Sequence, residues 1–533
     1  MLKLKMLNKD KVHSTIFNIT CIFILLQPIF DLLSFLQNEG YLSIGISTFA
    51  KPLIIGLINI ALLLVYKKQI WRCAITYGGY LILMVVHSLL LRGMLIEFSV
   101  ILHEIRFMIN ILYLLICYHD LRILYEEAPK KEAFFSKLKK ALIAAFAIYI
   151  FLYLLSVVTG TAGMTYGHSD HLKQGFKGWM HSGQIFGHTL CVCLPIIICT
   201  LLNAKFKRPV LRVICKLSVI LPILVLCLIG TKVSYYIAII VLAAQVALEL
   251  FYAIKDKKAS NLINSVICVV LVAACILAYP ITPVKTNTDI NNSVLSAKPD
   301  SSTISQLMQE ENNKHNLQSS SSLDSTSSVT SSQPVNSVSS NVQSSSNTAT
   351  SSEPEDNATS SDNTSSNSNN INNKLNEAEK NAKWTANALS VIEQKYVSGE
   401  LHPSDMRNRQ LYFNWEKFKQ ADFKYKLFGI GYVMHGDMAI ERDVLCMLFC
   451  FGIFGFILVL LRPIALWVKS LLAILKRPLK VKMAELCLFE GFSMFFFISW
   501  YAGATFIYTN FSVFLAILMC LLTHKINELK TEN

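Results

Sequence analysis

The sequence predicts an all-α, polytopic membrane protein of about twelve transmembrane helices, with one large extracellular loop between helices nine and ten. Of its 533 residues, 53% are hydrophobic and only 16% are charged, against roughly 25% charged residues in an ordinary soluble domain. The apolar residues fall in runs of about twenty, the length a helix needs to cross roughly 30 Å of hydrocarbon. Basic residues gather between alternate runs. Together these observations exclude a soluble globular enzyme.

Nine apolar runs precede the large loop and three follow it. The first run lacks a small-residue cleavage site and contains Gln27, Pro28 and Asp31, so we expect a retained span rather than a signal peptide. The seventh run is short and only a few residues separate the last two, so eleven or thirteen spans are alternatives. The expected spans cover residues 16–35, 45–66, 71–91, 96–118, 141–159, 181–202, 217–229, 233–252, 262–279, 444–461, 486–500 and 505–522.

The distribution of basic residues predicts the orientation, because Lys and Arg resist translocation. If the N-terminus lies inside, the cytoplasmic segments contain 29 Lys and Arg residues, whereas the short outer loops contain four, namely Arg92, Lys173, Lys177 and Lys232. The net charge of +14 then reflects topology rather than nucleic-acid binding. We expect a multi-pass protein with both termini cytoplasmic and the large loop extracellular. The 14 cysteines lie in or beside the apolar runs, as small core residues do.

Composition divides the chain into four parts. Residues 1–280 form an N-terminal transmembrane bundle, and residues 441–533 form the C-terminal transmembrane helices. Between them, residues 281–371 are expected to form a disordered extracellular insert rich in Ser and Asn, because residues 301–370 contain 25 Ser and no Phe, Tyr or Trp and cannot bury enough apolar surface to fold. Helical apolar spacing and aromatic residues return in residues 372–440, which predicts an ordered extracellular helical subdomain.

Charged residues inside spans are costly, so each suggests a function unless it forms a structural ion pair. Asp31 and Lys51 lie near the expected outer ends of the first and second spans and are either site residues or a structural pair. Several other charges from distant parts of the chain share that level, which predicts a polar cavity open to the outer face. They are Glu104, Arg106, Lys177, Lys232, Glu441, Arg442 and Asp443.

Structural alternatives apply to several of these groups. Lys177 and Lys232 have the positions of interfacial snorkelling residues, and the acids at 441–443 favour a helix N-terminus in any case. The basic run 407–419 has the composition of a solvated helix face. His87 and His188 are expected to be satisfied core histidines, and Glu490 lies deeper than the other charges.

Five strings, in this order and topological placement, resemble the O-antigen ligase and O-antigen polymerase superfamily, in a variant like that of Gram-positive bacteria. The resemblance covers the membrane body and the loop after about residue 380, and the expected plan of twelve spans with one large outer loop also matches. The strings are GFKGWMHSGQIFG at 175–187, GTKVS at 230–234, RNRQLYFNW at 407–415, LFGIGY at 427–432 and ERDVLCMLFCFGIFGFIL at 441–458.

The resemblance implies an enzyme that polymerises or ligates polyprenyl-pyrophosphate-linked oligosaccharide units at the outer face of the bacterial plasma membrane. Such enzymes act in capsule, exopolysaccharide or other surface-polysaccharide biosynthesis. They require no nucleotide sugar, no metal and no other cofactor. The implied partners are the lipid-linked oligosaccharide, membrane lipids and other polysaccharide-assembly proteins, and not nucleic acid. Lys177 replaces the Arg of many members, and Gly183 with Gln184 replaces Pro-Asn. Glu441 replaces the ligase His eleven residues before Gly452, which fits Gram-positive polymerases better.

The implied chemistry assigns roles to residues of this chain. Displacing a lipid pyrophosphate from an anomeric carbon develops negative charge, which cationic side chains stabilise in a partly dry cavity. The acceptor hydroxyl needs a general base, for which Glu441 is the first choice and His435 the second, with Asp443 as an orienting partner. The candidates for binding the pyrophosphate are Arg409, Arg407, Lys177, Lys232, Arg442 and Arg106.

Two other functional classes remain open. A transporter or flippase of lipid-linked sugars would use the same cavity without chemistry, although the two halves of the sequence do not match as transporter repeats often do. A membrane anchor displaying the Ser-rich segment would leave the cavity charges unexplained.

Overall fold

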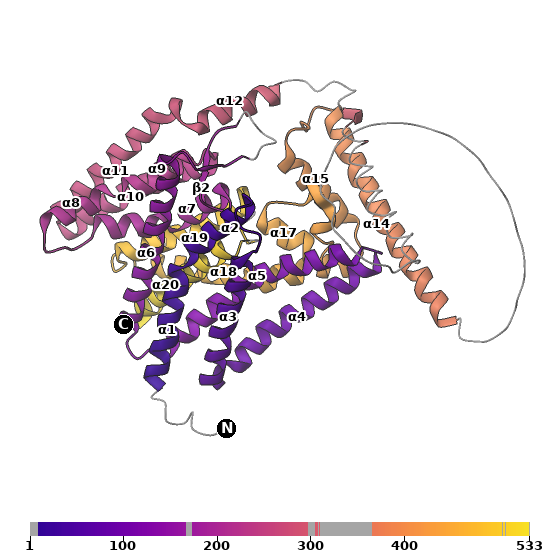
Figure 1. Cartoon of the computed structure of the whole chain (residues 1–533), viewed down its shortest axis with the longest axis horizontal. Helices are drawn as coiled ribbons and strands as arrows, with labels where there is room; N and C mark the ends of the chain where they lie inside the picture. Colours follow the sequence, from indigo (N-terminus) through magenta and orange to yellow (C-terminus); the bar gives the residue numbers. More distant parts are fainter. Residues whose placement is uncertain are drawn as a thin grey trace, which may run out of the picture.

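The structure is a computed structural model that describes residues 9–166, 173–296, 304–306, 309, 365–503, 505–506 and 508–531. Helices make up nearly all of the regular structure of these residues, and a two-stranded antiparallel sheet is the single sheet within them (Figure 1). The predicted all-α class is confirmed. The described residues contain eleven helices long and apolar enough to span a membrane, or twelve if one bent pair counts as a span.

The part of the chain before the large loop forms most of the bundle. Its sheet pairs Gly163 with Gly178 and Met164 with Phe176. The elements of this part are α1 (Lys9–Leu25), α2 (Gln27–Asn38), α3 (Ile46–Val65), η2 (Lys67–Gln69), α4 (Ile70–Gly93), α5 (Phe98–Glu126), α6 (Lys131–Val158), β1 (Gly163–Met164), β2 (Phe176–Gly178), α7 (Gly183–Leu202), α8 (Pro209–Leu217), α9 (Ile220–Leu228), α10 (Lys232–Asp256), α11 (Ala259–Ala278), η3 (Tyr279–Ile281) and α12 (Pro283–Ser296).

The part after residue 364 contains the subdomain expected to be extracellular at 372–440, called the outer subdomain below, and the last membrane helices. Most of the insert predicted at 281–371 lies outside the described residues, but its first part contains α12 and its last part the start of α14. The elements are α14 (Ser365–Val397), α15 (Met406–Gln420), α16 (Phe423–Phe428), η4 (Val433–Met438), α17 (Asp443–Cys450), α18 (Gly452–Lys476), α19 (Met483–Tyr501) and α20 (Thr509–Thr531).

Two of the predicted spans are broken. The first consists of α1 and α2, which meet at a 42° bend, where Pro28 removes a backbone donor from the helical ladder. The tenth, predicted at 444–461, is divided between α17 and α18 at Phe451, and α18 continues to Lys476. The predicted tenth span therefore ends too early, because Arg462 interrupts the apolar run without interrupting the helix.

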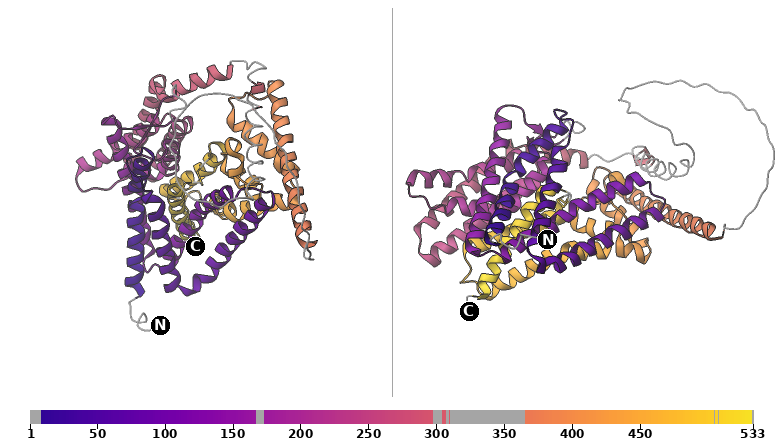
Figure 2. Two further views of the ribbon diagram at one scale, coloured as in Figure 1. Left: turned by 45° about the vertical axis from the view of Figure 1, so that its right-hand side comes forward. Right: turned by 60° about the horizontal axis from the view of Figure 1, so that its bottom comes forward.

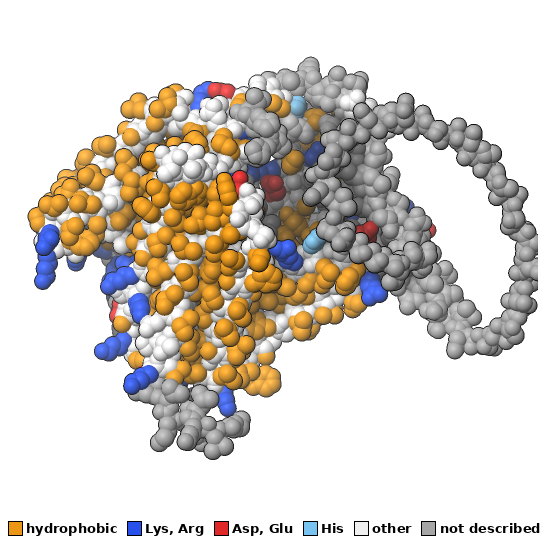
Figure 3. Space-filling view, viewed as in Figure 1, with side chains coloured by type: hydrophobic (Ala, Val, Ile, Leu, Met, Phe, Trp, Pro, Cys, Tyr) orange, Lys and Arg blue, Asp and Glu red, His pale blue; other side chains and the backbone are white. Residues whose placement is uncertain are grey.

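Helices α7 and α20 form the centre of the bundle. In each, 89% of the apolar window is buried inside the protein, whereas the windows of the other candidate spans are 22–50% buried. Helices at the periphery of the bundle, such as α3 and α4, expose apolar side chains including Leu53, Leu64 and Ile75, as helices that face lipid do. Figure 3 shows this broad hydrophobic surface, with Lys and Arg gathered along its lower and left edges.

Both ends of the described chain lie at the α5–α6 turn. Lys9 at the start of α1 forms an ion pair with Glu127 (3.1 Å), and His524 near the end of α20 lies 3.7 Å from Glu132. The two chain ends therefore lie at one end of the bundle. A chain that crosses the membrane an even number of times has both of its ends on the same side, as found here. Figure 2 shows in two views that the helices after residue 364 drawn in orange lie on the opposite side of the bundle from the magenta helices α8 to α11.

The outer subdomain packs on itself and on the α4–α5 turn. Ala388 and Ile392 of α14 pack against Phe413 of α15 in a small apolar core. Trp384 and Tyr425 belong to a second core that includes Leu91 at the end of α4 and Met94 in the α4–α5 turn. These contacts attach α14, α15 and α16 to the membrane bundle (Figure 1).

Candidate functional site

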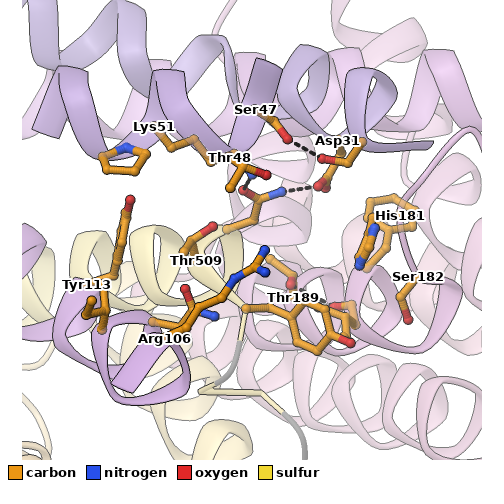
Figure 4. Close-up of a pocket in the computed structure, with 18 of the residues that line it drawn as sticks. Asp31, Ser47, Thr48, Lys51, Arg106, Tyr113, His181, Ser182, Thr189 and Thr509 are labelled. Carbon is orange, nitrogen blue, oxygen red and sulfur yellow. Dashed lines mark hydrogen bonds between the residues drawn. The ribbon is translucent and has the colours of Figure 1, made fainter. Parts of the chain in front are cut away.

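A polar cavity of about 340 Å³ lies where α2, α3, α5, α7 and α20 meet. It lies toward one end of the bundle, because Arg106 on α5 precedes Glu126, at the α5–α6 turn, by about 30 Å of helix. Figure 4 shows charged and polar side chains from these separate helices around one space. The polar and charged lining residues include Asp31, Ser47, Thr48, Lys51, Arg106, Asn110, His181, Thr189, Tyr508 and Asn510.

Asn510 joins Asp31 to Lys51 on one wall. Lys51 donates to the Oδ1 atom of Asn510 (2.6 Å), and the Asn510 amide nitrogen donates to Asp31. Tyr149 also donates to Asp31 (2.8 Å). The structural pairing of Asp31 and Lys51 offered as an alternative thus takes the form of a bridge through Asn510. The two charges are bridged by an amide from the last helix, so the wall is a connected polar network.

Arg106 is the cation that this network leaves available. Its guanidinium points into the middle of the cavity, across from Asp31 and Lys51 (Figure 4). Among the described residues it makes no hydrogen bond or ion pair. An arginine in a membrane helix needs an anionic partner or water, so this guanidinium is placed to receive an anionic group from a ligand.

His181 and Lys177 lie at another edge of the cavity. Burial lowers the pKa of His181; the carboxylate of Asp31 opposes this effect, and the charges of Lys51 and Lys177 add to it. Lys177 forms an ion pair with Glu39 (2.9 Å) and lies over the Phe35 ring. Lys177 therefore contributes its charge beside the cavity rather than from its wall.

Glu441 lies near Tyr508, one of the cavity-lining residues. Burial raises the pKa of Tyr508, and the Glu441 carboxylate raises it further, so this carboxylate lies within electrostatic range of the cavity wall. The Nε atom of Arg407 lies 3.5 Å from the Oε2 atom of Glu441, with both side chains more than a third exposed. The two predicted site residues, 34 positions apart, are thus brought together at a solvated position.

Helix α15 covers the segment that precedes α17. Arg442 donates to the Asn408 side chain (3.2 Å), and Gln410 accepts from the backbone N–H of Glu441 (3.4 Å). Arg409 is buried on the same helix. The structure therefore joins the predicted strings at 407–415 and 441–458 into one surface.

Asp443 faces away from that surface. Its carboxylate accepts hydrogen bonds from the backbone and hydroxyl of Thr505 (2.9 and 2.5 Å) and from the backbone of Phe506 (3.3 Å). It is 2% exposed. Gly503 (φ +67°) allows this turn to approach, because a Cβ there would clash with the Glu441 carbonyl. Asp443 thus fixes the α19–α20 connection beside Glu441.

Glu104 and His87 hold in place the glycine-containing loop, residues 428–433, which includes Gly429 and Gly431. Glu104 accepts from the backbone N–H groups of Tyr432 (2.9 Å) and Val433 (2.7 Å), and His87 contacts Glu104 (3.1 Å) and donates to the Phe428 carbonyl (2.7 Å). His87 is therefore a satisfied core histidine, as expected. Glu104, one of the charges expected in the cavity, is a buried loop anchor instead, because its carboxylate accepts the loop's backbone donors.

Two predicted site residues, His435 and Lys232, do not line the cavity, and the expected core histidine His188 does not line it either. His435 is buried in η4 and meets the Phe413 ring edge-on at 5.5 Å. Lys232 begins α10 and does not line the cavity. His188 is buried, but neither ring nitrogen has a hydrogen-bond partner among the described residues, so the expectation that it is satisfied is wrong.

Sequence reasoning missed three wall residues, Tyr149, Tyr508 and Asn510. Asn510 lies in an apolar run, and a polar residue inside such a run indicates a polar site within the membrane helices. It also missed Lys417, which lies within the basic run but is only 1% exposed. Burial lowers the pKa of Lys417 to about 7.

The described residues contain one group arranged to hold a metal, formed by Glu132, His524 and Glu528, whose ligand atoms lie within 4.8 Å of one another. It lies at the α5–α6 turn and shares no residue with the cavity. The cavity itself presents one amine, one guanidinium, one carboxylate, one imidazole, amides and hydroxyls. Because the carboxylate of Asp31 already accepts from Asn510 and Tyr149, the remaining groups suit an anionic or sugar ligand.

Comparison with known proteins gives the family. No curated protein and no solved structure matches the chain. Residues 13–529 match the family described as O-antigen ligase like membrane protein, which confirms the resemblance seen in the five strings. Since the match covers nearly the whole chain, this protein belongs to the O-antigen ligase-like family of membrane proteins.

Proposed function

We propose that the protein is a membrane glycosyltransferase that polymerises or ligates polyprenyl-pyrophosphate-linked oligosaccharides at the outer face of the bacterial plasma membrane, in capsule, exopolysaccharide or other surface-polysaccharide biosynthesis. The observation that carries the proposal is the Arg106 guanidinium, which has no partner among the described residues and points into a polar cavity within an apolar bundle. Membership of the ligase-like family supports it. So does the meeting of both chain ends at the other end of the bundle.

Arg106 is the cavity's anion-binding group in this proposal, and it receives the pyrophosphate of the lipid-linked sugar. Lys177 lies at the edge of the same space, while Arg407, Arg409 and Arg442 belong to the surface beside Glu441. Lys232, at the start of α10, does not line the cavity. Arginine suits this role because its planar fork donates two parallel hydrogen bonds to phosphate oxygens.

Glu441 is the proposed general base. It takes the proton of the acceptor hydroxyl, whose oxygen forms a bond to the anomeric carbon while the bond from that carbon to the pyrophosphate oxygen breaks. The pyrophosphate leaves on its lipid, and inversion at the anomeric carbon follows from single displacement. Glu441 suits the role because its carboxylate is accessible, whereas that of Asp443 is occupied by Thr505 and Phe506. His435 is the second candidate, and Asp443 positions the segment that bears Glu441.

The decisive experiment incubates purified protein in detergent with lipid-linked repeat units and measures glycan length. Longer chains, absent with Arg106→Ala, support the transferase. Unchanged lipid would refute it, and movement of that lipid across the bilayer of reconstituted vesicles would instead establish the rival transporter. Glu400→Gln is a matched control, because Glu400 pairs with Lys395 (2.6 Å) on the outer subdomain and is 62% exposed.

A further inference from the structure

A second, larger cavity lies at the opposite end of α7. Its volume is about 900 Å³, and its walls come from the end of α7, the start of α8, the end of α10, the start of α11 and the segment before α19. Helix α7 lines the first cavity as far as Thr189 and the second from Cys199 onward. These positions are ten residues apart, which is about 15 Å of helix, and the two cavities share no lining residue.

The second cavity is strongly basic. Seven of its lining residues are Lys or Arg, and its one acidic residue, Asp256, pairs with Lys258 at 2.9 Å. Lys216 donates to Asn264 (2.7 Å), and Lys255 lies over the Tyr252 ring. Lys216 and Lys482 also interact with the carboxylates of Glu249 and Glu485. The other four cations lack a carboxylate partner among the described residues, namely Lys205, Arg212, Lys255 and Lys480.

Three of these four cations lack an aromatic partner as well, within the part of the chain that the structure describes. Lys205, Arg212 and Lys480 are exposed, and none of them forms an ion pair there. They come from the α7–α8 connection, from α8 and from the segment before α19, so the fold gathers them from three places. Clustered cations repel one another unless an anion lies between them, which indicates an anionic ligand.

The rim of this cavity exposes apolar side chains. Phe206, Val213 and Ile263 line it and are 43%, 55% and 56% exposed. Arg212 on α8 lies among apolar residues that are also exposed, including Leu211 and Ile214, and α8 with α9 forms one candidate span. A ligand bound here contacts cationic groups and an exposed apolar surface together. A phospholipid matches both, because it has an anionic phosphate and apolar acyl chains.

We propose that this cavity binds the headgroup of an anionic phospholipid. The phosphate lies among Lys205, Arg212 and Lys480, and the acyl chains follow α8 and α11 outward. Basic pockets between membrane helices bind anionic headgroups in this way. In the proposed topology the site is cytoplasmic, distant from the glycan chemistry, and it does not depend on the proposed catalytic roles.

Native mass spectrometry of the full-length protein in detergent, titrated with phosphatidylglycerol or phosphatidylcholine, tests the site. The test variant combines Lys205→Gln, Arg212→Gln and Lys480→Gln. Its control combines Lys11→Gln, Lys67→Gln and Lys140→Gln, exposed residues that line neither cavity. We expect the test variant to bind phosphatidylglycerol at least about tenfold more weakly, the control to bind it normally, and phosphatidylcholine to bind all three proteins alike.

Three outcomes would overturn the proposal. Equal losses in the test and control variants would show only general surface charge. No loss in the test variant would show that the cavity does not bind this lipid. Displacement of phosphatidylglycerol by millimolar inorganic phosphate would assign the site to a soluble anion instead.

Discussion

Glu441→Gln separates a chemical role of this carboxylate from a structural one. The substitution keeps the size of the side chain and removes its charge and its basicity. The ion pair with Arg407 is 3.5 Å long and its side chains are 37% and 38% exposed, and pairs exposed to this degree contribute only about 0.2–1 kcal/mol. The contact with Gln410 uses the backbone of Glu441 and is unaffected. We therefore expect the unfolding temperature to fall by less than roughly 2 °C.

The expected loss of activity is much larger. A general base contributes roughly 10²- to 10⁴-fold, which corresponds to about 2.7–5.5 kcal/mol of activation free energy. The assay measures initial rates of glycan extension by purified variants alongside thermal unfolding in the same detergent, with Glu400→Gln as control. Wild-type extension rates in Glu441→Gln would refute the base assignment. A fall in unfolding temperature that accounts for the lost activity would show that Glu441 acts structurally.

Four further predictions concern other parts of the chain. Asp443→Asn should lower the free energy of unfolding by about 2 kcal/mol, since it weakens buried hydrogen bonds to Thr505 and Phe506; unchanged thermal stability would contradict this. Lys417, with a pKa of about 7 in the folded protein, binds fewer protons there than in the unfolded chain between about pH 7 and its ordinary value near 10.4, so stability should rise with pH across that window. Lys417→Met should reduce this rise in thermal unfolding measured at several pH values, and an identical pH dependence in both proteins would refute it. Arg106→Ala should abolish glycan extension without lowering thermal stability, since no described residue loses a partner, and normal extension would remove Arg106 from the site. Deleting residues 310–364, which contain no Phe, Tyr or Trp, should leave substantial extension activity, and complete loss in a folded protein would show that this segment takes part.

Local sequence predicted the membrane architecture well, for a physical reason. A span must be long enough to cross the hydrocarbon core and must satisfy its backbone hydrogen bonds internally, so runs of about twenty apolar residues become helices whatever surrounds them. The α1–α2 bend at Pro28 was not predicted, since residues 16–35 were expected to form one continuous span. The position of Phe451 between α17 and α18 was not predictable from the run, because Gly429 and Gly452 allow a close backbone approach there that only packing defines.

The candidate site depended on contacts that local spacing does not encode. Asp31 and Lys51 are close in sequence, yet the amide between them comes from Asn510 in the last helix. Glu104 and Arg106 are two residues apart on α5, but one anchors the glycine-containing loop and the other enters the cavity, because such neighbours point to different faces of a helix.

The sequence by itself determined that this chain spans a membrane, where its helices lie and to which family it belongs, since apolar length and short strings suffice for each. The tertiary structure alone decided which charges are partnered. In the folded chain, Thr505 donates a hydrogen bond to the carboxylate of Asp443, whereas the carboxylate of Glu441 stays accessible. Those outcomes depend on helices distant in sequence, and the energy of a charge in a low-dielectric interior is set by the groups that surround it.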